Sequence, residues 1–497
     1  MRRWLLLLPA LLTGCSALTY DQAACTAASD CREAFGLGWS CAESGFCEAA
    51  APNPRCSSTP DDILTSPADH ADRILLGSIF DRVDFTLMVK SARLAILQVN
   101  VEDGLAGQEF GIIECSNAES AGDDGLDPEQ ATAALGEELI ESWGVHALVG
   151  PATSGRASAA YNAWSPLGAV TISPSATSPA LTSIDGTTST DSEPGLFWRT
   201  APPDSLQGRV IAREMLALSH DNVAVIAQLG AYGQGLAEVF DQQFAAEGGS
   251  VTLLPFEESS DLAQAVVTAS AADFDAVLVI SSQTGDVVGF FNAIPVANLT
   301  DAYTAKTIFL PDGAFDAQLI EDTSAAARPL FDNVRGTVPR TPSGGAFKAF
   351  AAFYGLEYNG EDPSDFGFSA HAFDAAWLAI AGTAWSLHQE GRITGLGTAR
   401  GLRQLSDPDY EDPDTGEALP LGPTSWNDIA TNFAEGNAVD IVGASGSLDY
   451  DPISGETAAP INVWTIANGD FVTQYCVDLS PSPSPDCCTD PVTDACN

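Results

Sequence analysis

Residues 149–155 have the sequence Val-Gly-Pro-Ala-Thr-Ser-Gly, which ends a short apolar run and opens an Ala-rich segment. A second stretch on the same plan, Ile-Ser-Pro-Ser-Ala-Thr-Ser-Pro, occupies residues 172–179. Each predicts a buried strand followed by a hydroxyl-rich turn and the start of a helix. We expect Ser154 to cap the first helix and Ser178 to cap the second, where Pro179 suits the first helical position.

The same alternation of β-branched apolar runs and Ala-rich segments extends over about residues 72–475. The predicted strands are 145–150, 169–173, 223–227, 251–255, 276–281 and 307–310. The predicted helices are 155–164, 204–219, 233–247, 261–271, 285–294 and 345–354. Strands separated by helices indicate an α/β fold with parallel sheets buried on both faces. Because one sheet cannot hold so many elements, we expect two Rossmann-like lobes joined by a hinge, with linkers near residues 200 and 336.

The composition narrows the class of protein. The chain has 497 residues, with 20 Lys and Arg against 67 Asp and Glu, a formal net charge of −47 and 45% hydrophobic residues. So much apolar content predicts a folded protein with a sizeable core. The acidity predicts no binding of nucleic acid and no electrostatic attraction to anionic membranes, because both are polyanions.

The N-terminus has the features of an export signal. Two arginines precede an apolar run at residues 4–12, which is too short to span a bilayer but suits a signal-peptide core. The run ends in Leu-Thr-Gly followed by Cys15, which resembles a bacterial lipobox. We therefore predict a signal peptide over 1–14 and a lipid on Cys15, with the lipid as the only membrane attachment. Ser16 at the next position favours outer-membrane sorting over the inner membrane. The alternative is an ordinary secretory peptide.

The ten cysteines other than Cys15 form an even set, which in an exported chain indicates disulfides. Cys25, Cys31, Cys41 and Cys47 lie among glycines and predict a small cystine module within residues 15–60. A zinc site is the rival interpretation, although no CxxC pair or nearby histidine supplies the usual ligand spacing. The tail after residue 476 is rich in Cys and Pro and predicts an extended strap. The spacing does not determine which cysteines pair.

Polar residues gather at the predicted strand ends. The two turns that contain Ser154 and Ser175 bring two helix N-termini together, which suits a carboxylate or another small anion. Tyr232 precedes the glycines at positions 233 and 235, which permit close backbone approach at the start of a helix. Asp312 ends another strand and presents a carboxylate that an ammonium group would satisfy. The alternatives are serines that only cap helices, a packed tyrosine and an aspartate in a type I turn.

These stretches, together with residues 197–208 and 373–376, resemble type I periplasmic binding proteins of the Leu/Ile/Val class, which bind amino acids and amides. The resemblance covers about residues 72–475 and implies two lobes that close on a ligand. It implies the following division of the chain. The first lobe comprises 72–200 and 337–435, the second comprises 201–336 and 436–475, and the tail comprises 476–497.

The resemblance also implies roles for particular residues. Ser154 matches the hydroxyl that binds the ligand carboxylate, and Ser175 and Thr177 match positions that hold the amino acid through backbone and hydroxyl contacts. Tyr232 matches the tyrosine that closes over the ligand from the second lobe. Asp312 takes the place of the family's ammonium-binding acid, which is usually Glu. The chain departs from the family near residue 77 and after residue 280, where the side-chain pocket is formed.

Other chemistries lack support in the sequence. No HExxH, P-loop or GxSxG motif is present, and the five histidines are scattered, so we predict no enzyme and no cofactor. The acidic loop at 407–417 lacks the EF-hand order of ligands, so a solvated loop is favoured over a Ca²⁺ site. Cys115 closes a predicted strand and is expected to pair with Cys56 or with the tail, a reactive thiol being the alternative.

The sequence thus predicts an extracytoplasmic, lipid-anchored solute-binding protein for a small molecule, an amino acid or amide. Such a protein would deliver its ligand to an ABC permease and ATPase. The alternative is a surface sensor or scaffold lipoprotein that uses the same fold without transport. The additional cystine module favours that alternative, because uptake does not need one.

Overall fold

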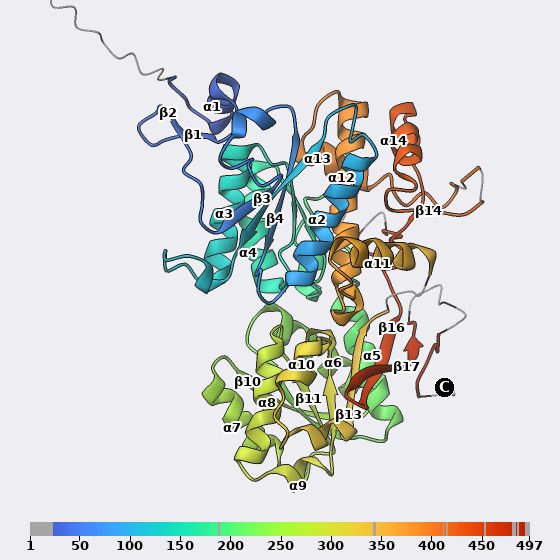
Figure 1. The fold of residues 1–497 in the computed structure, drawn as a ribbon. Coiled ribbons are helices and arrows are strands. Elements are labelled where there is room, and N and C mark those ends of the chain that lie inside the picture. Colours follow the sequence, from blue (N-terminus) through green and yellow to red (C-terminus); the bar gives the residue numbers. More distant parts are fainter. Residues whose placement is uncertain are drawn as a thin grey trace, which may run out of the picture.

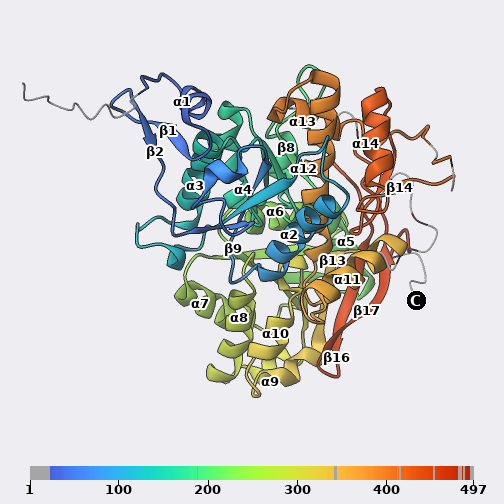
Figure 2. The ribbon, with the colours of Figure 1, turned by 45° about the horizontal axis from the view of Figure 1, so that its top comes forward.

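The computed structural model describes residues 23–186, 189–340, 344–410, 412–413, 416–451, 454–479, 484 and 487–492. The chain forms two α/β lobes, which lie one above the other in Figure 1 and are seen from a second direction in Figure 2. The predicted signal peptide and Cys15 lie outside the described residues. In the part of the chain that is described, no helix has both the length and the apolar character needed to cross a bilayer.

The first lobe is built on a six-stranded sheet with the order β3-β5-β4-β6-β7-β8. These strands are β3 (Cys56–Thr59), β5 (Phe110–Ser116), β4 (Ile74–Phe80), β6 (Ala147–Val149), β7 (Val170–Ser173) and β8 (Phe197–Arg199). All are parallel except β3, which runs antiparallel to β5 along the edge. Every residue of β4 and β5 is buried, because helices cover both faces of the sheet.

Two apolar clusters lie on the two faces of this sheet. One packs α2 and the long helix α12 against the strands, with Met88 and Trp377 buried in it. The other contains Leu135, Trp143 and Trp164 from α3 and α4. The helices of this lobe are α2 (Thr86–Val101), α3 (Pro128–Trp143), α4 (Ser154–Trp164), α11 (Gly345–Glu357), α12 (Ser369–Glu390), α13 (Gly395–Leu402) and α14 (Trp426–Glu435).

The second lobe is built on a seven-stranded sheet with the order β10-β9-β11-β12-β13-β16-β17. Its strands are β9 (Asn222–Gln228), β10 (Ser250–Phe256), β11 (Ala276–Ile280), β12 (Thr307–Leu310), β13 (Val334–Pro339), β16 (Ile461–Ala467) and β17 (Asp470–Val477). The first five are parallel, whereas β16 and β17 are antiparallel. Its helices are α5 (Asp204–Ala217), α6 (Ala231–Ala246), α7 (Ser259–Ala269), α8 (Thr284–Val296), α9 (Thr300–Tyr303) and α10 (Ala317–Asp322).

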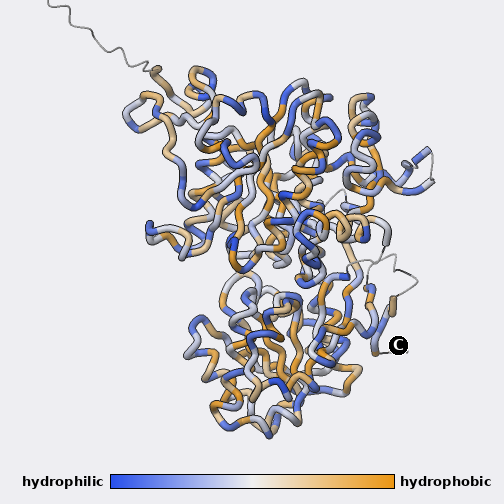
Figure 3. The backbone as a smooth tube through the Cα atoms, in the orientation of Figure 1, coloured by the Kyte–Doolittle hydropathy of each residue, from blue (hydrophilic) through white to orange (hydrophobic). Residues whose placement is uncertain are grey.

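The predicted fold class is confirmed, and each predicted strand and helix has its counterpart in β6, β7, β9 to β12, α4 to α8 and α11. Hydrophobic segments run through the centre of both lobes in Figure 3. The short helical segments are η1 (Pro67–His70), η2 (Glu119–Ala121), η3 (Ser165–Leu167), η4 (Pro179–Ser183), η5 (Asp312–Ala314), η6 (Arg328–Asn333) and η7 (Pro363–Asp365).

The return of the chain to the second lobe occurs later than the expected residue 436. The segment that contains β14 (Leu419–Pro420) and β15 (Ile441–Val442) contributes to the core of the first lobe, and this includes Leu448 and Tyr450. Tyr450 packs edge-on against Trp198 at 5.0 Å between ring centroids and is 7% exposed. Burial of this aromatic ring keeps the segment on the first lobe, and the second lobe resumes at β16.

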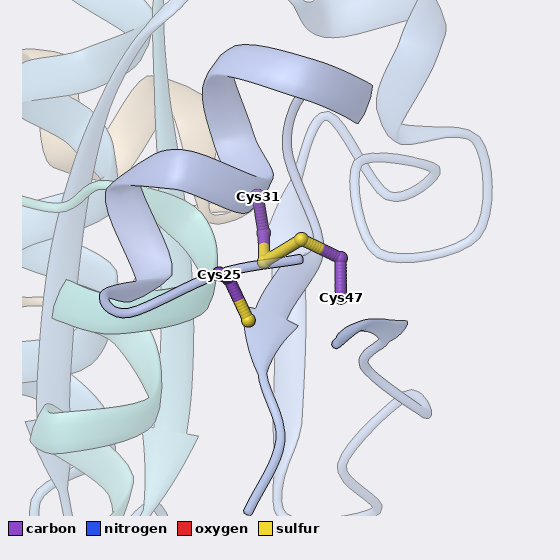
Figure 4. A group of neighbouring side chains, drawn as sticks. All are labelled: Cys25, Cys31 and Cys47. Carbon is purple, nitrogen blue, oxygen red and sulfur yellow. A yellow bond between two sulfur atoms is a disulfide. The ribbon is translucent and has the colours of Figure 1, made fainter. Parts of the chain in front are cut away.

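The N-terminal cystine module consists of α1 (Ala28–Phe35), β1 (Trp39–Cys41) and β2 (Cys47–Ala49). Its disulfides join Cys25 to Cys41 and Cys31 to Cys47. Figure 4 shows the sulfurs of Cys25, Cys31 and Cys47 close together, with the bond between Cys31 and Cys47 in place. The zinc alternative is wrong for this structure, because a sulfur in a disulfide offers no thiolate to a metal.

Outside the module, disulfides also join two pairs of described residues. Cys56 and Cys115 occupy paired positions of β3 and β5 and are joined by a disulfide. Cys56 is one of the two partners expected for Cys115. Cys476 at the end of β17 is bonded to Cys487 in the tail. The module itself rests on the first lobe, where the Gly38 N–H donates to the carbonyl of Ser142 in α3 over 3.0 Å.

Candidate functional site: a cleft between the lobes

A cleft of about 320 Å³ lies between the two lobes. This volume is in the range of small-ligand sites, about 300 to 1,000 Å³. The first lobe contributes Asp84, Phe85, Met88, Ala152, Thr153, Ser154, Ser175, Phe366 and Phe368. The second lobe contributes Tyr232, Ser282, Gln283, Thr284, Gly285, Asp286, Asp312, Gly313, Asp316 and Gln318. Four of the five sequence-predicted ligand residues, all but Thr177, therefore meet in one cleft.

The turns after β6 and β7 form the floor on the side of the first lobe. The expectation that Ser154 caps α4 is wrong, because Thr153 is the N-cap and Ser154 is the first helical residue. The Ser154 hydroxyl instead accepts a hydrogen bond from the Ser178 N–H over 3.1 Å, which links the two turns. Ser178 accepts from the Ala180 N–H as predicted, although the helix it begins is a short 3₁₀ segment. The Ser175 hydroxyl donates to the carbonyl of Ala152 over 2.8 Å.

Thr177 lies behind this floor and is not among the described residues that line the cleft. It is 1% exposed, and its carbonyl accepts a hydrogen bond from the Asp204 N–H over 2.8 Å. The Thr177 hydroxyl lies beside the Asp204 carboxylate and favours the charged form, at a geometry short of a good hydrogen bond. The structure thus connects Thr177 to the hinge, where Asp204 begins α5.

Asp312 and Tyr232 form the deep end on the side of the second lobe. The Tyr232 hydroxyl donates to the Asp312 carboxylate over 2.7 Å, and both side chains are buried. Burial raises the pKa of Asp312 to about 6, although the Tyr232 hydroxyl and the Gln207 amide favour its charged form. A cationic partner would stabilise the charged form of this buried carboxylate.

A second buried acid stands next to Asp312. Asp204 is 0% exposed, and neither oxygen of its carboxylate accepts a good hydrogen bond. Burial first, and then the charge of Asp312, raise the pKa of Asp204 well above its usual value. Two neighbouring carboxylates in a buried place disfavour each other's charge. Asp204 carries no sequence signal of a site residue, because an acid in the first turn of a helix has an ordinary structural role.

The two glycines at the start of α6 permit close approach of neighbouring atoms, as the sequence suggested. A Cβ atom at Gly233 would lie 2.1 Å from the carbonyl oxygen of Gln228, so only glycine fits there. A Cβ atom at Gly235 would lie 3.0 Å from the hydroxyl of Ser178 in the first lobe. The same hydroxyl donates to the Ala231 carbonyl over 2.8 Å, so α6 begins in contact with the first lobe.

The structure adds cleft residues that the sequence analysis missed. Asp84 and Phe85 follow β4, Asp286 lies in the first turn of α8, and Asp316 caps α10. Phe366 precedes α12. The sequence offers one indication of the cleft residues after β4 and β11. In these loops the chain departs from the family pattern. Membership of a common cleft, however, depends on the packing of both lobes.

Comparison with known proteins places these observations in context. The sequence model of the periplasmic binding protein family matches residues 83–430. A Leu/Ile/Val-binding protein of Rhizobium johnstonii is 28% identical over 269 residues, which is 52% of this chain and 66% of the relative. The chain thus matches just under two thirds of the length of that relative. This relative is a solute-binding protein and not an enzyme, as the sequence analysis predicts here.

Solved structures have the same fold. A branched-chain amino acid transporter substrate-binding protein of Streptococcus pneumoniae, in complex with isoleucine, superposes with a TM-score of 0.59 at 20% identity, covering 81% of this chain and 99% of that one. A solute-binding protein of an ABC transporter of R. palustris, in complex with benzoate, gives 0.59 at 16% identity, with 84% and 99% covered. From the matched domain, the two lobes and the cleft between them, it follows that this chain belongs to the periplasmic binding protein family, with a type I fold and an extracytoplasmic location.

Proposed function

We propose that the protein captures a small solute with an α-amino-acid-like head group, an amino acid or an amide, between its two lobes. The observation that carries this proposal is the pairing of Ser154 and Ser175 on one wall of the cleft with Tyr232 and Asp312 on the other. Ligand binding would draw the lobes together, and the closed form would be the one that an ABC permease and its ATPase recognise.

The hydrogen bonds of the cleft residues support a division of roles. The Ser154 hydroxyl accepts a bond from Ser178 and retains its proton, which can be donated to a ligand carboxylate. The Ser175 hydroxyl donates to Ala152 and retains lone pairs, which suit an ammonium group. Asp312 supplies the counter-charge for the same ammonium, and Thr177 keeps the hinge residue Asp204 in place.

A thermal-shift screen against amino acids, amides, peptides and sugars tests the proposal. A ligand at about 100 times its Kd adds about 2.7 kcal/mol to stability. Asp312→Ala is expected to weaken binding of the identified amino acid by about 2 to 5 kcal/mol, because it removes the partner of a buried charge. Asp301→Asn, an exposed acid on α9, serves as the control and is expected to bind normally. An unchanged affinity in Asp312→Ala would remove this residue from the site.

We also propose that Cys15 carries a lipid and tethers the protein to a bacterial membrane, the outer membrane being favoured. The Leu-Thr-Gly-Cys sequence at residues 12–15 supports this. Cys15→Ala is expected to move the protein from the membrane fraction to the soluble fraction. Persistent membrane attachment of the variant would contradict the lipobox interpretation.

The sensor or scaffold alternative is favoured by one observation. The cystine module packs on α3 of the first lobe, a part of the lobe that contributes no residue to the cleft. Such a module presents a separate surface to a partner without affecting ligand capture. Uptake of radiolabelled ligand by cells with and without the gene separates the two functions. Deletion would reduce uptake if the protein serves transport and would leave uptake unchanged if it is a sensor.

A further inference from the structure

We propose that the outer part of the cleft binds a second cationic group, so that the ligand is an amino acid with a basic side chain. This inference rests on the proposed function, because it assigns the class of side chain that the same cleft receives. It departs from the isoleucine-bound protein of S. pneumoniae, whose ligand has an apolar side chain.

The first observation is the charge of the cleft lining. Besides Asp312, the carboxylates of Asp84, Asp286 and Asp316 line the cleft, and none of the described lining residues is Lys, Arg or His. A neutral side chain would leave these acids without compensation when closure removes water. A cationic side chain would compensate them, and the surrounding negative potential would also accelerate its entry.

Asp84 and Asp316 approach the cleft from opposite lobes. Asp316 is held at the start of α10, where its carboxylate accepts from the Gln318 N–H over 2.9 Å and from the Thr284 hydroxyl over 3.4 Å. Burial is the main cause of the raised pKa of Asp316, and the charge of Asp84 raises it further, so the two carboxylates interact across the cleft. Closure would bring these two carboxylates closer together. A cation between them would offset their repulsion.

Asp286 adds a third carboxylate on the side of the second lobe. The Ser281 hydroxyl donates to it over 2.7 Å, and the Gln228 amide donates over 3.3 Å. These bonds fix the carboxylate at the beginning of α8. Arg156 lies near Asp84 and partly offsets its charge, but it does not line the cleft and its own neighbours include Asp81 and Glu129.

The second, independent observation is Asp204. This carboxylate is fully buried beside Asp312 and has no good hydrogen bond, and the cation that acts on it, Arg199, is already paired with Glu456. Asp312 lines the cleft and Asp204 lies behind it, so two acids stand near the place where one ammonium is to be held. Burial favours the neutral form of Asp204 by raising its pKa, and a cation at this end would favour ionisation of both acids.

Apolar side chains line the same cleft as these acids. Phe85, Met88, Phe366 and Phe368 line the cleft, and the rings of Phe85 and Phe366 lie 6.1 Å apart. Such walls suit the methylene stem of a basic side chain, whose charged end then reaches the outer carboxylates. A cleft lined by acids and by apolar side chains matches a ligand with two positive charges and a short hydrocarbon spacer.

Calorimetric titration of the purified full chain with L-lysine, L-arginine and L-norleucine tests the inference. Norleucine has the lysine stem without its ammonium, and we expect L-lysine or L-arginine to bind at least about tenfold more tightly. Asp84→Asn/Asp316→Asn is expected to remove that preference, so that L-lysine and L-norleucine bind with similar affinity. The matched control, Asp241→Asn/Asp301→Asn, removes the same charge from exposed positions of α6 and α9 and is expected to retain the preference.

Three results would overturn the inference, and they are distinguishable. Tighter binding of norleucine or leucine than of lysine would reject the cationic subsite while the amino-acid function stands. Binding of Ca²⁺ alone, lost in Asp84→Asn/Asp316→Asn, would assign these acids to a metal. Silence toward all amino acids in a protein with a cooperative melting transition would reject both the subsite and the proposed function.

Discussion

Tyr232 and Asp312 are 80 residues apart in the sequence, yet the tyrosine hydroxyl donates to the aspartate carboxylate over 2.7 Å in the cleft. Tyr232 comes from the start of α6, and Asp312 follows β12. These elements meet because β9, β11 and β12 are neighbouring parallel strands, whose carboxyl ends lie along one edge of the sheet. The bond helps to keep a buried acid charged in the part of the cleft where an ammonium group would bind.

Replacing Tyr232 by Phe is therefore expected to weaken ligand binding. A hydrogen bond to a charged group contributes about 1.5 to 3 kcal/mol, which corresponds to about 10-fold or more in affinity. Calorimetry at pH 7.5 measures the effect. Tyr303→Phe is the matched control, because the Tyr303 hydroxyl donates to the Val266 carbonyl over 2.7 Å in the core of the second lobe. That variant should lose stability and keep its affinity; equal affinities for both variants would contradict the role of Tyr232.

Ligand affinity is expected to fall as the pH falls from 7.5 to 5. The pKa of Asp312 is about 6, raised mainly by burial, and an ammonium ligand binds the charged form. At pH 5 only about a tenth of such a group is ionised, so affinity should be about tenfold lower. Titrations in one buffer series at constant ionic strength measure this. Asp312→Asn should bind weakly with a flat pH profile, and a steep profile in that variant would assign the effect elsewhere.

Arg199 is expected to be a major contributor to stability. Its guanidinium is 1% exposed, pairs with Glu456 at 2.5 Å, and donates to the carbonyls of Ala176 and Ser178, each over 3.0 Å. Arg199→Met leaves these groups without their partner and should cost about 3 to 5 kcal/mol. Urea denaturation followed by circular dichroism measures the loss. Glu361→Gln, which breaks the more exposed pair with Lys90, should cost less than about 1 kcal/mol. Similar midpoints for the two variants would refute this ranking.

The disulfide between Cys56 and Cys115 is expected to stabilise the first lobe. It closes a separation of 59 residues and joins the edge strand β3 to β5. The loop-entropy relation gives about 4 kcal/mol for a loop of this length. Cys56→Ser/Cys115→Ser should therefore unfold at a lower urea concentration. Cys25→Ser/Cys41→Ser is the comparison, since it loosens only the N-terminal module and should leave ligand affinity unchanged. An unaltered midpoint in the first variant would argue against the stabilising role.

Local sequence patterns predicted the central strands of the sheets and the helices that follow them. Buried parallel strands such as β9 and β11 are continuous apolar runs, and the turns that follow them contain residues suited to helix starts. The strands β16 and β17 escaped prediction, because β16 pairs antiparallel with β13, more than 120 residues earlier, and β17 takes its place by pairing with β16. The expected boundary at residue 436 was wrong for a related reason, since Tyr450 belongs to the first-lobe core through its contact with Trp198.

The sequence by itself determined the α/β class, the two-lobed plan, the family resemblance and the strand-end residues Ser154, Ser175, Tyr232 and Asp312. These follow from local periodicity and from motifs that a few consecutive residues carry. Only the tertiary structure decided that Thr177 lies behind the cleft, that Asp204 stands beside Asp312, and that Asp84 faces Asp316 from the other lobe. Such relationships arise from packing between segments that are distant in the sequence. Hydrophobic burial drives that packing and is non-directional, so a local sequence pattern does not specify which segments meet.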